Sequence, residues 1–202
     1  METQRHGDGE DDLIRSRRAT SLGDHQEVRI NEAYSGYAPP VNVVKVVRRL
    51  LAGVPNQYLR GLDCVVLTNL SGQPRRKRLG KVTSRGGRIE KSRIAGLYHG
   101  KWKGQSPWIE LYVDQILRRW PRWTLWIPFA RDVAIAETFY HELGHHVHLF
   151  IRPEYREKED VADDWQRKFM KTFLRGEYWY LIPVARLVKM MRGRRTDKSN
   201  TD

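Results

Sequence analysis

The segment at residues 138–148 reads TFYHELGHHVH and holds four histidines beside one glutamate. His141 and His145 are four residues apart, so on a helix both imidazoles face the same way and can bind one metal ion. Glu142 lies about 100° round the helix from His141, near enough to reach a metal-bound water without being a ligand. The spacing therefore predicts a zinc site with Glu142 as general base.

The same segment has the apolar period of a helix over about residues 132–150. Its apolar side chains recur every three or four positions, at Ile135, Phe139, Leu143, Val147 and Phe150. His148 shares the histidine face, but seven helical residues rise about 10 Å from His141, too far for both to bind one ion. We expect His146 and His148 to be packing or surface residues, with the third ligand elsewhere.

A second acidic motif, EDVAD at residues 159–163, follows in the next predicted helix, which begins at about residue 154. Glu159 can turn back to the metal from an antiparallel helix. Asp163 lies one turn later and can hydrogen-bond the far nitrogen of a ligand histidine, which fixes the orientation of the imidazole. The two motifs together therefore predict a complete site.

HELGH at 141–145 and EDVAD at 159–163 together resemble the motifs of the gluzincin metallopeptidases. The resemblance implies one zinc ion per chain, Glu159 as its third protein ligand, Asp163 as a supporting carboxylate and water-mediated hydrolysis of peptide bonds. It also implies a compact zincin-like core, in which an edge strand beside the active-site helix pairs with an extended polypeptide substrate.

The third ligand has alternatives. Only thirteen residues separate His145 from Glu159, a short connection for that family. The other acidic candidates are Glu157, Asp160 and Asp163. The spacing to an outer carboxylate favours Glu159.

The remaining patterns predict a single α+β domain at 31–192, with an N-terminal arm at 1–30 and a basic tail at 193–202. A helix within residues 41–53 carries Val43, Val46, Val47, Leu50 and Leu51 at helical spacing and ends at Gly53. Other predicted elements are strands at 62–70, 93–100 and 106–114 and a short basic helix at 183–193. We expect a small twisted sheet, backed by the first helix and flanked by the zinc-binding helix pair.

The third predicted strand is a candidate for the edge that pairs with substrate, because an exposed edge offers unpaired backbone groups. Its residues are Trp108, Ile109, Glu110, Leu111 and Tyr112. The same pattern also fits an interior strand. For stabilising the oxyanion, the candidates are Tyr98, His99 and Tyr178, and the pattern distinguishes none of them.

The composition limits the class of protein. The 202 residues are 40% hydrophobic, no apolar run approaches the roughly 20 residues of a membrane span, and the N-terminus lacks a secretory apolar core. These features predict a cytoplasmic protein. The single cysteine, Cys64, excludes an internal disulfide and a thiolate metal cluster.

The net charge of +13 indicates anionic partners. Residues 73–103 hold eleven Lys or Arg and one acidic residue, which is typical of a solvated basic loop or of salt-sensitive nucleic-acid binding. The alternative functions are therefore a nucleic-acid-associated protease, or a nucleic-acid-binding protein with a structural or degenerate zinc site. The aromatic and basic segment at 177–195 can also lie on an anionic membrane, a less favoured interpretation.

Overall fold

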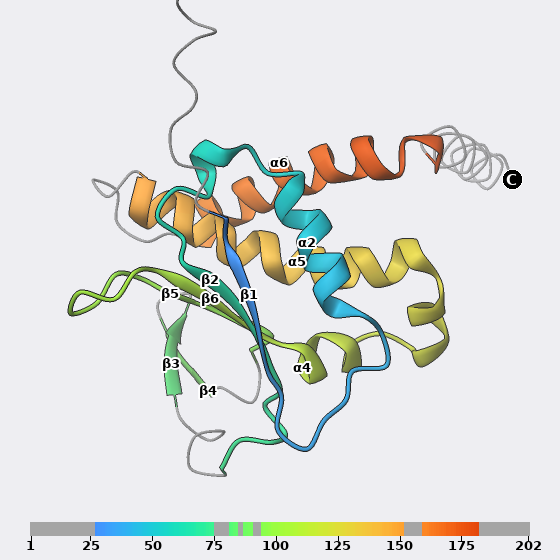
Figure 1. Ribbon diagram of the computed structural model, residues 1–202, viewed down its shortest axis with the longest axis horizontal. Helices are drawn as coiled ribbons and strands as arrows, with labels where there is room; N and C mark the ends of the chain where they lie inside the picture. Colours follow the sequence, from blue (N-terminus) through green and yellow to red (C-terminus); the bar gives the residue numbers. More distant parts are fainter. Residues whose placement is uncertain (1–26, 75–80, 85–86, 91–93, 152–158, 182–202) are drawn as a thin grey trace, which may run out of the picture.

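A computed structural model describes residues 27–74, 81–84, 87–90, 94–151 and 159–181 of the chain. The protein is mixed α+β, as predicted. A four-stranded sheet lies against helices α2 and α5, and α6 packs on the other side of α5 (Figure 1). This layering places α5 in the centre of the molecule.

The sheet has the strand order β1-β2-β6-β5. Its strands are β1 (Arg29–Ala33), β2 (Cys64–Thr68), β6 (Trp108–Tyr112) and β5 (Gly96–His99). The first three are parallel, and β5 is antiparallel to β6. Side chains alternate between the two faces of each strand. Val65, Leu67, Ile109 and Leu111 share one face and are fully buried in the core.

The prediction that Trp108 to Tyr112 form the sheet edge is wrong. Strand β6 pairs with β2 on one side and with β5 on the other, so its backbone groups are used within the sheet. Alternation in the sequence shows which face of a strand is buried but not which strands flank it. The alternative interpretation, that this segment is an interior strand, is the correct one. The edge strand on this side is β5.

Helix α2 (Val43–Ala52) forms as predicted. The Asn42 side chain accepts a hydrogen bond from the Lys45 N–H at 2.8 Å and caps the first turn. Five apolar residues at helical spacing are buried, and Gly53 ends the helix. Two short elements, α4 (Val113–Arg118) and η3 (Arg122–Trp126), then lead from β6 to α5.

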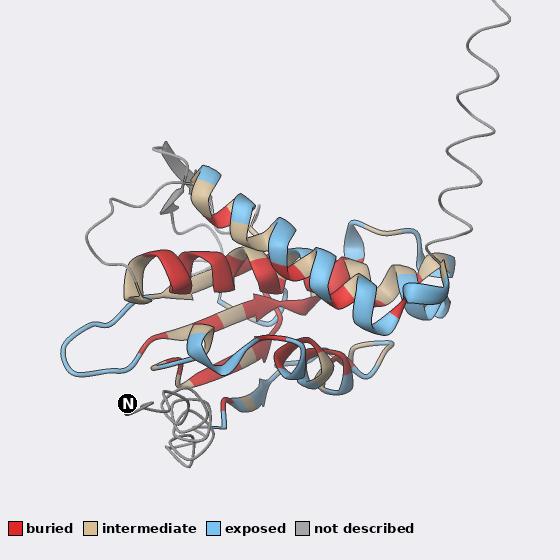
Figure 2. Cartoon of the chain, turned by 90° about the horizontal axis from the view of Figure 1, so that it is seen from above, coloured by how far each residue is buried: buried red, intermediate tan, exposed pale blue. Residues whose placement is uncertain are grey.

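Helix α5 (Pro128–His146) is buried on nearly all sides because it lies between the sheet and α6 (Figure 2). It continues into one π-helical turn, η4 (Val147–Ile151). Helix α6 (Glu159–Glu177) then packs along α5 and ends at the short η5 (Trp179–Leu181). The two predicted motifs thus lie on neighbouring helices.

One element of the sheet was not predicted. Strand β1 takes up the last two residues of the expected arm. The basic segment, for which the sequence indicates a loop or a ribbon, includes a separate antiparallel ribbon of β3 (Lys81–Ser84) with β4 (Gly87–Glu90). The predicted helix at 183–193, the tail and residues 1–26 lie outside the described part of the chain.

Among the helices of the described ranges, α5 included, none combines the length and apolarity needed to cross a bilayer.

Candidate metal centre

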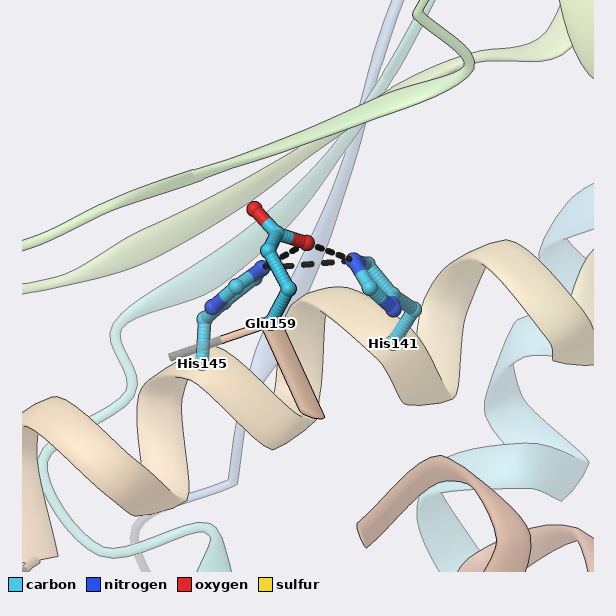
Figure 3. A group of neighbouring side chains, drawn as sticks. All are labelled: His141, His145 and Glu159. Carbon is cyan, nitrogen blue, oxygen red and sulfur yellow. Dashed lines mark hydrogen bonds and ion pairs between the residues drawn. The ribbon is translucent and has the colours of Figure 1, made fainter. Parts of the chain in front are cut away.

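Three side chains of the predicted set meet at the crossing of α5 and α6: His141, His145 and Glu159 (Figure 3). The two imidazole Nε2 atoms lie 3.3 Å apart. Glu159 Oε2 is 3.4 Å from His141 Nε2 and 3.8 Å from His145 Nε2. One oxygen and two nitrogens thus converge on one point.

These separations fit a tetrahedral metal ion. Ligand atoms at about 2.0–2.1 Å from such an ion lie roughly 3.4 Å from one another. The observed distances of 3.3, 3.4 and 3.8 Å are close to that value. Two imidazole nitrogens and a carboxylate oxygen are also a donor set that zinc accepts. The group can therefore hold a metal ion.

Asp163 orients one of the two histidines. Its Oδ1 atom lies 2.9 Å from His141 Nδ1, and because a carboxylate accepts, the ring nitrogen donates. With Nδ1 donating to Asp163, the Nε2 atom of His141 faces Glu159 and His145. This is the contact expected of Asp163 from its spacing in the sequence.

Gly144 sets the distance between the two helices. A Cβ atom at this position would lie 2.6 Å from the Ala162 carbonyl oxygen and 2.9 Å from the Ala162 Cα, both on the backbone of α6. Only glycine allows so close an approach. Since Glu159 and Asp163 lie within a turn of Ala162, this contact brings both carboxylates to the histidines.

Glu142 is buried between α5 and the edge strand β5. A Cβ atom at Gly96 in β5 would lie 2.8 Å from Glu142 Cγ and 2.9 Å from its Oε1. The missing side chain of Gly96 therefore leaves the space that Glu142 occupies. Gly96 was not among the predicted site residues, although a glycine inside a strand often marks the close approach of another element.

His145, one of the two candidate ligand histidines, has restricted access and a neutral ring. Burial, followed by the nearby His141, lowers the pKa of His145 well below its ordinary value, so this ring is neutral at pH 7. A histidine must be in this deprotonated, neutral form to bind a metal ion. The side chains of His141 and Glu159 remain 20% and 19% exposed, so water reaches the cluster.

His146 and His148 take no part in the three-residue group. His146 is fully buried, and its Nε2 donates to the Arg60 carbonyl at 3.1 Å. Its Nδ1 therefore accepts from the Tyr98 hydroxyl, 3.3 Å away. Burial lowers the pKa of His146 to about 4. His146 is a packing residue that fastens the end of α5 to β5, and His148 is buried in the π-helical turn.

The predicted oxyanion candidates lie in different places. Tyr178 donates to Asp132 at the other end of α5. His99 stacks on Trp108 and contacts Glu110, on the sheet face opposite to that of Tyr98. Tyr98 binds His146. Of the three, Tyr98 alone contacts a direct neighbour of His145 in the sequence, namely His146.

The alternative third ligands are also distinguished by position. Asp160 is exposed and does not join the group, and Asp163 contacts the far side of the His141 ring. Glu157 lies outside the described residues. Glu159 is the carboxylate that the structure brings to both histidines.

Comparison of the chain with protein-family models, with curated proteins and with solved structures found no match. The resemblance to the gluzincins therefore depends on the HELGH and EDVAD motifs of the sequence.

Proposed function

We propose that the protein is a zinc metallopeptidase with a zincin-like core, in which His141, His145 and Glu159 bind the ion. The observation that supports this most strongly is the convergence of the three ligand atoms at separations of 3.3 to 3.8 Å. The Asp163 contact adds a supporting carboxylate of the kind that usually orients a metal-bound histidine.

When bound, a zinc ion supplies a Lewis acid that lowers the pKa of a water molecule and polarises the scissile carbonyl. Glu142 accepts the proton of the attacking water and then delivers a proton to the leaving amine. Its burial beside Gly96 holds the carboxylate at the edge of the sheet. Asp163 keeps the His141 ring in the required orientation.

A catalytic role explains the arrangement better than a purely structural one. Structural zinc sites are usually closed by four protein ligands, whereas catalytic sites have three and keep one position open. Three ligand residues meet in the described part of the chain, at a site that water reaches. A structural site would also have no use for the adjacent Glu142.

The position of β5 supports a polypeptide substrate. This strand pairs only with β6 among the described residues and lies against α5 at Glu142. An edge strand can add an extended peptide through backbone hydrogen bonds. A peptide bound there would cross the site beside the proposed general base.

A second proposal is that the basic segment at 73–103 recruits the protease to nucleic acid. Its described backbone includes a β-ribbon, and residues 73–103 hold eleven Lys or Arg. Several phosphate contacts would make binding to arbitrary DNA fall steeply with salt. Binding that does not change with salt would contradict this proposal.

The catalytic proposal is tested by Glu142→Gln. This variant removes the proton acceptor and keeps the ligands, so we expect zinc binding to persist while cleavage of a proteome-derived peptide library falls by about 10² to 10⁴-fold. Glu137→Gln is the matched control, because Glu137 is an exposed glutamate on the same helix.

Two results would contradict the proposed function. One is a wild-type protein that binds no zinc when purified with zinc present. The other is a Glu142→Gln variant that cleaves the library as fast as Glu137→Gln does.

A further inference from the structure

A group of large apolar side chains is exposed at the end of the molecule opposite the metal centre. We name it the aromatic surface, and its residues are Trp123, Trp126, Ile127, Phe129, Trp179 and Tyr180. Trp126 is 84% exposed, Trp123 68% and Trp179 66%. Exposed groups of this kind usually mark an interaction site.

The residues of the aromatic surface come from two segments that meet in space. Trp123 and Trp126 lie in η3, directly before α5, whereas Trp179 and Tyr180 lie in η5, directly after α6. The Phe129 ring packs edge-on against Tyr178, with the ring centroids 5.1 Å apart. Figures 1 and 2 both show the start of α5 and the end of α6 at the same end of the molecule.

The charges around the aromatic surface are positive. Residues 115–131 hold four arginines and no acidic residue. Arg118, Arg119 and Arg122 are exposed. The chain continues beyond Leu181 with five basic and no acidic residues in 182–195.

The nearest carboxylates have cationic neighbours. Asp132 and Glu177 both contact Arg49, and Arg119 acts electrostatically on Glu137. Arg131 also contacts Asp132, so Arg118 and Arg122 are the exposed arginines of 115–131 that add positive charge beyond these pairs.

We propose that the aromatic surface docks on an anionic lipid bilayer. Tryptophan and tyrosine favour the boundary between headgroups and acyl chains, and nearby arginines are attracted to acidic lipids. Ile127 favours lipid over nucleic acid, because an aliphatic side chain gains nothing from base stacking. This is an interfacial contact and requires no spanning helix.

Docking of this kind separates the candidate metal centre from the membrane contact. Phe129 and His141 are twelve positions apart on α5, a distance of about 18 Å along the helix axis. The first turn of α5 would lie at the bilayer, with the site at the other end of the helix. This inference does not depend on the proposed peptidase activity.

The test is sedimentation of the full chain with sucrose-loaded vesicles of phosphatidylcholine, with or without about 30% phosphatidylserine. We expect binding to the anionic vesicles to exceed binding to the neutral ones by about tenfold or more, and to weaken in high salt. The double variant Trp123→Ala/Trp126→Ala should lose about tenfold or more of the anionic binding. Trp179→Ala, in the second segment of the aromatic surface, should also reduce binding to the anionic vesicles.

Trp102→Ala is the matched control, since Trp102 is 69% exposed in the β5–β6 loop, on the other side of the molecule in Figure 1. It should bind anionic vesicles within about twofold of the wild type. Because all the substituted side chains are exposed, the variants should keep the wild-type thermal transition, which is checked in parallel.

Four outcomes would overturn the proposal. In the first, the wild type does not bind anionic vesicles, and in the second, the double variant binds them as well as the wild type does. In the third, the wild type is a dimer in sedimentation equilibrium, and the double variant loses the dimer but still binds vesicles. In the fourth, the double variant loses binding to an oligonucleotide and still binds vesicles. The last two would assign the surface to self-association or to nucleic acid.

Discussion

The two ends of helix α5 carry polar clusters that differ in how their charges are balanced. Near the first turn, the buried Asp132 accepts from Arg49 at 2.7 Å, from Arg131 at 3.0 Å and from the Tyr178 hydroxyl at 2.5 Å. Near the last turn, His141, His145 and Glu159 bring two imidazole nitrogens and a carboxylate oxygen together. The first cluster contains its own cations, whereas the second consists of electron-pair donors.

The difference predicts a structural role for the first cluster and a metal-binding role for the second. Buried charges are tolerated when protein groups neutralise them, and removing one partner is then costly. A cluster of electron-pair donors is fully stabilised only when it binds a cation, so that metal binding and folding are linked. We therefore expect substitutions at the Asp132 end to change folding and those at the histidine end to change metal binding.

The largest expected effect is at the Asp132 end. Asp132→Ala leaves Arg49, Arg131 and the Tyr178 hydroxyl without their shared acceptor, so the free energy of unfolding should fall by about 3–5 kcal/mol. Urea denaturation measures this loss, and zinc content per folded chain should stay unchanged. Asp164→Ala, which breaks an exposed pair with Arg167, should cost about 0–1 kcal/mol. Equal losses in the two variants would remove the contrast.

Acid sensitivity of the metal-free protein should come from the histidine end. The pKa of His146 is about 4 in the folded protein and near 6.5 when unfolded, so between these values only the unfolded chain binds the proton. Stability should be complete above about pH 6.5 and fall by up to about 3 kcal/mol as the pH approaches 4.

This pH dependence is measured by urea denaturation of chelator-treated protein at several pH values. His146→Gln, which has no titrating ring, should show a shallower loss over the same window. Parallel pH profiles for the two proteins would show that His146 is not the responsible group.

Gly144→Ala should affect both folding and metal binding, because it acts where α5 and α6 cross. The added methyl group would meet the Ala162 backbone at 2.6 Å and push α6 away, at a cost of about 1–3 kcal/mol. Gly176→Ala in α6 has open space around it and should be neutral or stabilising by up to about 1 kcal/mol. Unchanged zinc affinity in Gly144→Ala would mean that the crossing does not position Glu159.

Asp163→Ala should affect metal binding alone. Loss of the contact to His141 Nδ1 leaves all three ligands in place but frees the ring, so zinc affinity should fall by about 10 to 100-fold. Competition with a chromogenic chelator measures the affinity, and Asp164→Ala serves again as the neighbouring control. The same affinity in both variants would remove the orienting role of Asp163.

The elements with a strong apolar period were predictable from the sequence. Helices α2 and α5 and strands β2, β5 and β6 appear where the patterns place them, because each buries a regular set of apolar side chains. Strand β1 was missed because its residues RINEA are mostly exposed and polar. Its position depends on pairing with β2, a contact that no local pattern encodes.

The site was predictable to the extent that it lies within one helical turn. The spacing of His141 and His145 fixes their common face, and that of Glu159 and Asp163 indicates two carboxylates on one helix. The roles of Gly144 and Gly96 could not be predicted, because each depends on a neighbour distant in the sequence, Ala162 and Glu142 respectively. The choice of edge strand needed the sheet order for the same reason.

The most direct test of the account is a zinc titration of the wild type, Glu159→Ala and Asp160→Ala, with a competing chelator. We expect the wild type to bind about one zinc per chain, Glu159→Ala to lose about 100-fold or more in affinity, and the exposed Asp160→Ala to stay within about threefold. A wild type that binds no zinc, or a loss confined to Asp160→Ala, would contradict the proposed metal centre.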